Sequence, residues 1–366
     1  MAQPVRFPSG VSTYSAKSIF QNYPSVATPV QMVSSNDFAP YLGTTAFTFT
    51  QSNGTAAVTS WPGGVVKLAT TTGAADKAIL ALGASGNSAL STMMIPGNQA
   101  WFNLDLAVAA STVNDATATV LRWGLFDVAD ISGTITNGIY FEKATNSSGR
   151  VDLIIKNNSS GSVVTTTIQK ISDLTVPSGI YGDTSSTAGT LTTNGSAGVY
   201  NSIVVGTPGS GYAQAPLVLA TGATGSGSQL YCQLGSGSLY APYVLTGGSS
   251  YTTYVNEVDP WQQYSLWWDG KDTLKVGVNG KIVATIGPQG VTGLAAGGTA
   301  DATATGPSYY STSTLSTGVA PIQPKAGSAY TIIPKIPLTA AVGIINASGA
   351  GRAIYIDDLV VACETN

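Results

Sequence analysis

The sequence predicts an all-β protein: a sandwich of strands, interrupted by a small β insertion and preceded by an extended arm. Charged residues make up only 9% of the 366 residues, and glutamate occurs only three times. Long exposed helices need Glu, Lys and Arg, so few helices are expected. The chain holds 43 glycines and 18 prolines, which favour frequent turns. Several segments also alternate apolar and polar residues with the period of a strand.

Residues 1–31 are expected to form an N-terminal arm without a core of its own. Its four prolines fix φ and remove backbone donors, which disfavours helices and central strands. Two interpretations stay open: a floppy tail, or an extended segment that becomes ordered on a partner. The second is favoured because disordered tails are usually charged and poor in aromatic residues. The residues expected to contact the partner are Arg6, Phe7, Tyr14, Phe20 and Tyr23.

Residues 32–176 are expected to form the first part of the sandwich. In "AWFNLDLAVAAS" every second residue is apolar, which places Asn103 and Asp105 on the opposite face of the strand. The apolar face carries Phe102, Leu104, Leu106 and Val108. The stretch "NGIYFEKATNSSGRVDLIIKNN" predicts two further strands joined by a polar loop. This spacing is typical of a β-sandwich.

Residues 177–257 are expected to form a small inserted β domain. Gly, Ser, Thr and Tyr dominate there, and "TPGSGYAQAPLVL" and "LTGGSSYTTYVNE" form a degenerate repeat of a tyrosine-containing turn and a short strand. A loop of this length without structure of its own is improbable. Because loop closure costs little more as a loop lengthens, strands on both sides of the insertion are expected to belong to one sandwich.

Residues 258–366 are expected to complete the sandwich. The segment "DPWQQYSLWWDG" places Tyr264, Leu266 and Trp268 on one face of a strand. Asn279-Gly280 predicts a type I′ hairpin, because both central residues of that turn need a positive φ. A Gly-, Ala- and Thr-rich stretch at about 288–330 is expected to be a long surface loop. Two last strands are predicted in "LTAAVGIINASGAGRAIYIDDLVVACETN".

The composition argues against several function classes. A net charge of −3 gives no electrostatic footprint for nucleic acid, and no apolar run is long enough to suggest a membrane partner. Histidine is absent, which excludes Ser-His-Asp and Cys-His nucleophile pairs within this chain.

Cys232 and Cys363 are expected to be free buried thiols. No metal and no cofactor is expected. No signal peptide is recognisable, so synthesis in the cytoplasm is expected.

Two resemblances extend these predictions. "WQQYSLWWDGKDTLKVGVNGKIVATI" followed by "RAIYIDDLVVA" resembles concanavalin-like (laminin-G-like) jelly rolls, which implies that fold for the sandwich. The opening "PVRFPSGVST", with "NDFAPY", "AWFNLDLAV" and "NGIYFEK", is similar to tailed-phage proteins that decorate or cement podovirus heads. The "GSGYAQAPLVL" segment is similar to Gly-Ser-Gly-Tyr repeats of phage structural proteins. Together they imply a virion protein on the outer capsid surface, made in the host cytoplasm.

Carboxylates are the only acid–base groups that the sequence offers to a glycan hydrolase, which is the less favoured alternative. Such enzymes usually need two carboxylates across a groove. Glu142 is isolated in the sequence, whereas Glu257 and Asp259 would share one face of a strand. Both are more simply explained as solvated turn residues, so no catalytic residue and no enzyme are expected. Asp357 and Asp358 would point to opposite faces of a regular strand, so they are not expected to chelate one ion.

A glycan-binding tail or fibre adhesin is the other alternative. Its contacts would be exposed aromatic side chains that stack on sugar rings. Trp101, Trp123, Trp267 and Trp268 lie in predicted strands and are expected in the core. Tyr309 and Tyr310, in the predicted loop, are the better candidates for contact with a host surface glycan.

The favoured function is a structural one. A low charge density reduces repulsion between closely packed copies, and β edges offer main-chain groups to neighbours. A proline-rich arm loses less entropy when it is ordered on a partner. The expected partners are the major capsid protein and further copies of this chain in a closed homo-oligomer, with a trimer favoured.

Overall fold

The computed structural model of the chain confirms the all-β fold class. It describes residues 30–35, 47–59, 65–73, 75–82, 98–113, 119–144, 149–158, 163–222, 224–271, 273–287, 290–292, 295–296, 308–311, 333–334, 336–347 and 351–364. Within these ranges one short helix, α1 (Ala110–Val113), accompanies twenty-four strands. None of the described helical structure is long and apolar enough to cross a membrane.

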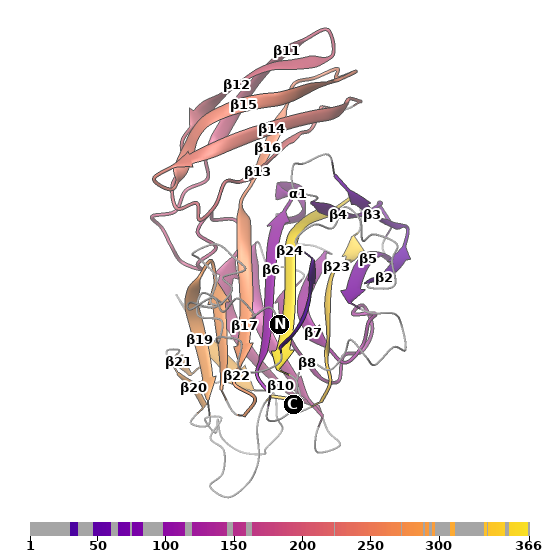
Figure 1. The fold of residues 1–366 in the computed structure, drawn as a ribbon, viewed down its shortest axis with the longest axis vertical. Coiled ribbons are helices and arrows are strands. Elements are labelled where there is room, and N and C mark those ends of the chain that lie inside the picture. The colour runs from indigo at the N-terminus through magenta and orange to yellow at the C-terminus, as the bar shows by residue number, and fades with distance from the viewer. Residues whose placement is uncertain are drawn as a thin grey trace, which may run out of the picture.

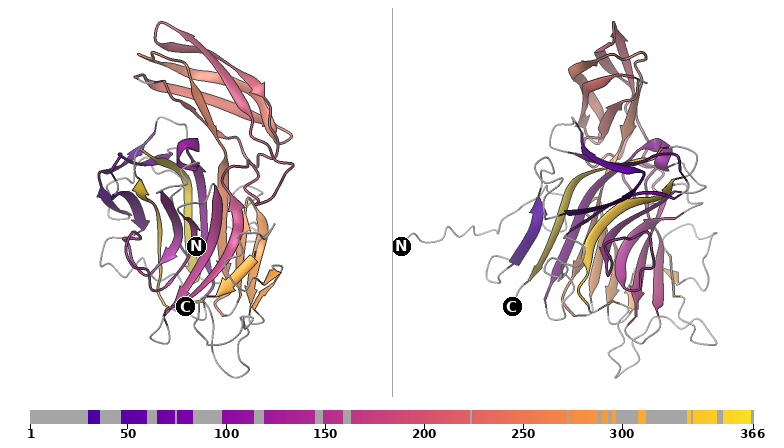
Figure 2. Two further views of the ribbon diagram at one scale, coloured as in Figure 1. Left: turned by 180° about the vertical axis from the view of Figure 1, so that it is seen from behind. Right: turned by 90° about the vertical axis from the view of Figure 1, so that its right-hand side faces the viewer.

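Two nine-stranded sheets form the sandwich (Figures 1 and 2). Sheet A has the order β20-β19-β18-β17-β6-β24-β4-β3. Strand β4 pairs with residues 353–356 of β24, and β1 pairs with residues 359–364 of the same strand. Its strands are β1 (Val30–Ser35), β3 (Gly54–Val58), β4 (Val66–Thr70), β6 (Ala100–Val108), β17 (Trp261–Trp268), β18 (Leu274–Val278), β19 (Lys281–Gly287), β20 (Gly290–Thr292) and β24 (Ala353–Glu364).

Sheet B has the order β2-β5-β23-β7-β8-β9-β10-β22-β21. Its strands are β2 (Phe47–Ser52), β5 (Asp76–Leu82), β7 (Val120–Phe126), β8 (Gly138–Lys143), β9 (Arg150–Asn157), β10 (Val164–Asp173), β21 (Ala295–Ala296), β22 (Ser308–Ser311) and β23 (Thr339–Ala347). Neighbouring strands are antiparallel in both sheets, except that β21 and β22 are parallel.

The main core lies between the two sheets and follows the predicted alternation. The apolar face of β6 is buried there, as are Tyr264, Leu266 and Trp268 of β17. Rings from both sheets meet at the centre: Trp123 lies 4.8 Å from Tyr264 and 5.9 Å from Phe141, measured between centroids. The predicted turn is also present, since Asn279 and Gly280 have φ values of 48° and 76°.

The prediction of one long loop at about 288–330 is wrong in part, because the described residues of this segment form three short strands, β20, β21 and β22. β20 extends sheet A beside β19, and β22 pairs with residues Thr166–Gln169 of β10 in sheet B. Glycine, alanine and threonine occur in both loops and edge strands. Composition alone therefore does not reveal backbone pairing with a strand far away in the sequence.

Six strands form a separate group at one end of the sandwich (Figure 1). They make three two-stranded sheets, β11–β12, β13–β16 and β14–β15, around an apolar cluster of their own. The two copies of the sequence repeat end in β13 and β16, which pair with each other, and the tyrosine of each copy, Tyr212 and Tyr251, enters the cluster. The bounds are β11 (Thr190–Ser196), β12 (Val199–Thr207), β13 (Leu217–Ala220), β14 (Ser226–Gly235), β15 (Ser238–Ser249) and β16 (Asn256–Asp259).

A buried hydrogen-bond network joins the chain where it leaves the sandwich to the chain where it returns. Gln262 Nε2 donates to the carbonyl oxygens of Asp173 at 2.9 Å and Val176 at 3.1 Å, and Gln262 Oε1 accepts from Tyr264 Oη at 2.7 Å. Asn279 Nδ2 donates to the carbonyl oxygen of Ser178 at 2.7 Å. The network therefore holds the segment after β10 against β17, the strand that follows the insertion.

Replacing Gln262 with leucine, which has a similar volume, is expected to lower the free energy of unfolding by about 2–3 kcal/mol. The reason is that two partly buried carbonyl oxygens lose a donor and the buried Tyr264 hydroxyl keeps only its hydrogen bond with Ser172. Urea unfolding at neutral pH measures the change. Tyr264→Phe is the control, since it removes one hydroxyl and leaves the two carbonyl bonds in place. A Gln262→Leu variant as stable as the wild type would contradict this role.

Candidate binding surfaces

A cluster of three aspartates lies on the outward side of sheet A, where β24 is bulged. Ile356 of β24 is paired with Leu106 of β6, but Leu359 is paired with Leu104, so Asp357 and Asp358 together stand opposite Asp105. Ile356 and Leu359 both point into the core, which leaves the two aspartates between them directed away from it. The prediction that they point to opposite faces is therefore wrong, because the strand is not regular there.

Burial dominates the electrostatics of this cluster. It raises the pKa of Asp105 to about 7, and the nearby Asp357 charge acts in the same direction, whereas hydrogen bonds from Gln263 and Gln214 oppose it. Burial, together with the charges of Asp105 and Asp357, raises the pKa of Asp358 to about 7, and burial raises that of Asp357 to about 6. At neutral pH the cluster therefore retains protons that exposed aspartates would lose.

Two buried oxygen atoms at the centre of this cluster lack a hydrogen-bond partner. Asp105 Oδ1 and the facing Gln263 Oε1 are buried and have no hydrogen-bond partner among the described residues. Within the same ranges, no group of three or more Asp, Glu, Cys or His side chains is placed to hold a metal ion. The neighbouring outward residue Asn103 is also fully buried, at 0% exposure, although the alternation alone would place it on a solvated face.

A second group of carboxylates, a pair, lies where the six-strand group meets the sandwich. Glu257 and Asp259 are two residues apart on β16, as expected for one face of a strand, and the Glu257 charge acts on Asp259. Asp259 is only 1% exposed, and its burial raises its pKa to about 8. Its neighbour Trp261 packs with Leu217 and Tyr355 in a small apolar cluster. In this conformation Asp259 is too deeply buried to reach a glycosidic oxygen, and the prediction that it is a solvated turn residue is wrong.

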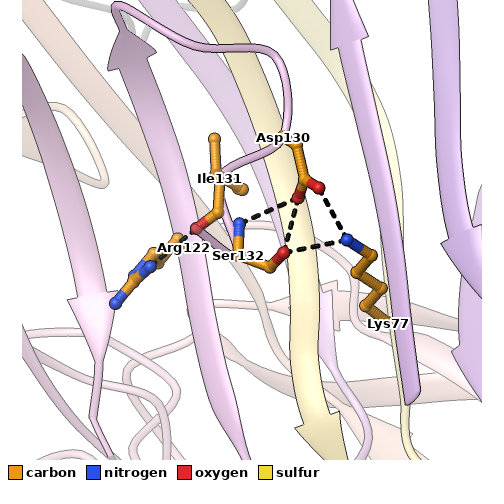
Figure 3. Close-up of polar contacts among 5 residues, drawn as sticks. All are labelled: Lys77, Arg122, Asp130, Ile131 and Ser132. Carbon is orange, nitrogen blue, oxygen red and sulfur yellow. Dashed lines mark hydrogen bonds and ion pairs between the residues drawn. The ribbon is translucent and has the colours of Figure 1, made fainter. Parts of the chain in front are cut away.

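Glu142 is part of a polar network on the outward side of sheet B. Its Oε2 accepts from Arg122 Nε at 2.6 Å, and Arg122 Nη1 donates to the Ile131 carbonyl oxygen at 2.6 Å. Figure 3 shows that Arg122 and Lys77 approach the same loop from two strands, with Lys77 Nζ 2.6 Å from Asp130 Oδ2. These contacts hold the loop over the sheet, where Ile131 is buried. Glu142 is therefore occupied in an ion pair.

A tyrosine surface lies on the six-strand group, on the β14–β15 ribbon. Tyr231 is paired with Tyr243 across the ribbon, and Gln233 is paired with Tyr240. The rings of Tyr231 and Tyr243 lie 5.2 Å apart with an angle of 47° between their planes. Tyr240 is 63% and Tyr243 41% exposed. We call Tyr231, Gln233, Tyr240 and Tyr243 the tyrosine face.

The arm contacts predicted from the sequence are not tested by the described structure, and the two predicted loop tyrosines lie in a strand. The predicted arm contacts, Arg6, Phe7, Tyr14, Phe20 and Tyr23, lie outside the described residues. Tyr309 and Tyr310 lie on strand β22, where they pair with Ile168 and Thr167, rather than in a loop. The sequence analysis missed the tyrosine face. The one signal in the sequence is the concentration of Tyr231, Tyr240 and Tyr243 in an uncharged segment, because the bulge that brings Tyr240 and Tyr243 to one face is not visible in their spacing.

No protein-family model matches the sequence, and no curated protein sequence matches it. Among solved structures, the chain is similar to an endo-1,3-beta-glucanase from Streptomyces sioyaensis, with 10% identity, a TM-score of 0.34 and coverage of 87% of this chain and 90% of that one. It is also similar to the CBM2 module of the evolved Dit of Lactobacillus casei BL23 phage J-1, with 10% identity, a TM-score of 0.32 and coverage of 93% and 98%. A third similar structure is the receptor binding domain of botulinum neurotoxin D, with 7% identity and a TM-score of 0.33. The match covers 86% of this chain but only 44% of the neurotoxin chain. Scores this low do not establish a shared function.

Proposed function

We propose that this protein is a non-catalytic structural protein that decorates or cements the outer surface of a phage capsid, with the N-terminal arm as its attachment element. The sequence predicts an arm of residues 1–31, but Val30 and Gln31 belong to strand β1, so residues 1–29 are the part proposed to attach. The observation that carries the proposal is the pairing of β1 with β24. Val30 to Ser35 pair in register with Glu364 to Leu359, so the strand that directly follows the arm is built into sheet A.

This pairing suits a tether. A pull directed along β1 would be shared by the backbone pairing of all six positions with β24. A tether that entered through a loop would load one or two contacts at a time. The low charge of the chain, 9% of residues, adds little repulsion between copies packed on a shell. We propose a closed homo-oligomer, favouring a trimer, and the major capsid protein as partner.

Deleting residues 2–29 is expected to leave a folded protein that no longer joins particles, because β1 and everything after it are retained. Co-sedimentation with heads that lack this protein measures attachment, and circular dichroism with a thermal melt checks the fold. Undiminished attachment of the truncated chain would contradict the proposal. A second truncation, of residues 2–35, removes β1 as well and is expected to lower the melting temperature.

The two alternatives differ in where the protein sits and in what it does. A tail or fibre adhesin would be present at a dozen copies or fewer per particle, whereas a shell protein would be present at hundreds. A hydrolase would release reducing ends from a polysaccharide. The burial of Asp259 and the ion pair of Glu142 favour a non-catalytic role for both.

A further inference from the structure

We propose that the tyrosine face of the β14–β15 ribbon is a binding site for an uncharged glycan, whose sugar rings lie against Tyr240 and the Tyr231–Tyr243 pair. This site would serve the protein whether it is attached to a capsid shell or to a tail, so it goes beyond the proposed function.

The ribbon has two different faces, and packing explains only one of them. Leu230, Cys232 and Leu239 point into the apolar cluster of the six-strand group and are buried. The tyrosines alternate with these residues and point the other way. Burial in the apolar cluster explains why the inward positions are apolar. It does not explain three large tyrosine rings on the outward face, because these rings stay partly exposed to water and add little to stability.

A bulge in the ribbon shapes the outward face. The register shifts between Tyr231 and Gln233, so Cys232 of β14 stands opposite the two residues between Tyr240 and Tyr243. Ala241, one of those two, has a φ of 43°. The bulge keeps Tyr240 and Tyr243 on the same face although they are three residues apart. A regular strand would have turned one of them inward.

The chemistry of the surroundings selects an uncharged, hydroxyl-rich ligand. No Asp, Glu, Lys or Arg occurs anywhere between Asp183 and Glu257, so strands β11 to β15 offer no charged side chain to pair with a charged ligand. Tyrosine combines an apolar ring face, which suits the C–H face of a sugar, with a hydroxyl that donates and accepts hydrogen bonds. Gln233 is exposed on the same face, and its amide group also donates and accepts.

The full-length protein should be run in native gels that contain laminarin, mannan or dextran, three neutral polysaccharides, and in gels that contain alginate, an acidic one. At least one neutral polysaccharide is expected to retard the wild type, and alginate is not. Tyr240→Ala and Tyr243→Ala are each expected to weaken the retarding interaction by about tenfold, as expected for the loss of one stacked ring. Tyr243→Phe, which keeps the ring, is expected to bind within about threefold of the wild type.

The matched control is Val204→Ala on β12, which changes a residue 56% exposed in the same strand group but outside the tyrosine face. It should bind like the wild type. The proposal is overturned if no neutral polysaccharide retards the wild type, or if the alanine variants bind unchanged. It is also overturned if size-exclusion chromatography shows a self-association that Tyr240→Ala abolishes, because the face would then be a contact between copies of this chain.

Discussion

Replacing Trp123 with alanine is expected to lower the free energy of unfolding by about 3–5 kcal/mol, the usual cost of removing a fully buried aromatic side chain. Trp123 is 0% exposed and contacts rings from both sheets, Phe141 beside it in sheet B and Tyr264 across the core. Its removal therefore leaves a cavity where the two halves of the sandwich meet. Urea denaturation followed by circular dichroism measures the loss.

Trp267→Ala is the matched control for this experiment. Trp267 is on the other side of sheet A and is only partly buried, with the Lys275 ammonium 4.7 Å from its ring centroid. We expect Trp267→Ala to lower the free energy of unfolding by about 1–2 kcal/mol, the scale of a surface cation–π contact and one part-buried hydrogen bond, here from the indole nitrogen to Gln99 Oε1 at 3.2 Å. Equal losses for the two tryptophans would contradict the assignment of Trp123 to the centre of the core.

The free energy of unfolding is expected to fall as the pH rises from about 4 to about 8. The folded pKa values of Asp105, at about 7, and Asp259, at about 8, lie above the ordinary 3.8. Across this interval the unfolded chain releases protons that the folded chain keeps, so rising pH favours unfolding. At about 1.4 kcal/mol per pKa unit, Asp105 alone accounts for a loss on the order of 2–3 kcal/mol between pH 5 and pH 8. Urea unfolding at pH 5 and pH 8 measures the difference.

Asp105→Asn is expected to flatten this pH dependence, and to make the protein more stable than the wild type at pH 8, because asparagine carries no charge to bury. Asp130→Asn is the control. Although burial favours its protonated form, hydrogen bonds from Lys77 and Ser132 lower the pKa of Asp130, so it stays ionised at both pH values. Asp130→Asn should therefore lower the free energy of unfolding by the same amount at pH 5 and at pH 8. A wild type with the same stability at both pH values would contradict the expectation.

The sequence predicts the inward faces of the strands well, because alternation reports burial against a core directly. Leu104 and Leu106, for example, lie where the period of two places them. The aspartate cluster could not be predicted in the same way. The bulge at Asp357 and Asp358 depends on how β24 pairs with β6, and the burial of Asn103 depends on what covers the outward side of the sheet. Neither is encoded in the pattern of one strand.

The binding surfaces show the same limit. Aromatic residues in the segment about 288–330 were expected to be exposed because of its loop-like composition, but β22 pairs Tyr309 and Tyr310 with sheet B. The tyrosines of the β14–β15 ribbon lie in a segment of similar composition, and there the rings are exposed. Local composition is alike in the two cases. What differs is the strand with which each segment pairs, and this emerges only from the three-dimensional structure.

The hydrogen-bond network around Gln262 has a consequence for how such proteins diversify. It fixes Ser178 and Gln262, the ends of the excursion that contains the six-strand group, beside each other on the sandwich. A graft with closely spaced ends could therefore replace that group, provided that it also covers Trp261 and Tyr355, which pack against Leu217 of the group. The architecture allows the exchange of one inserted strand group for another while the pairing of β1 with β24 stays the same.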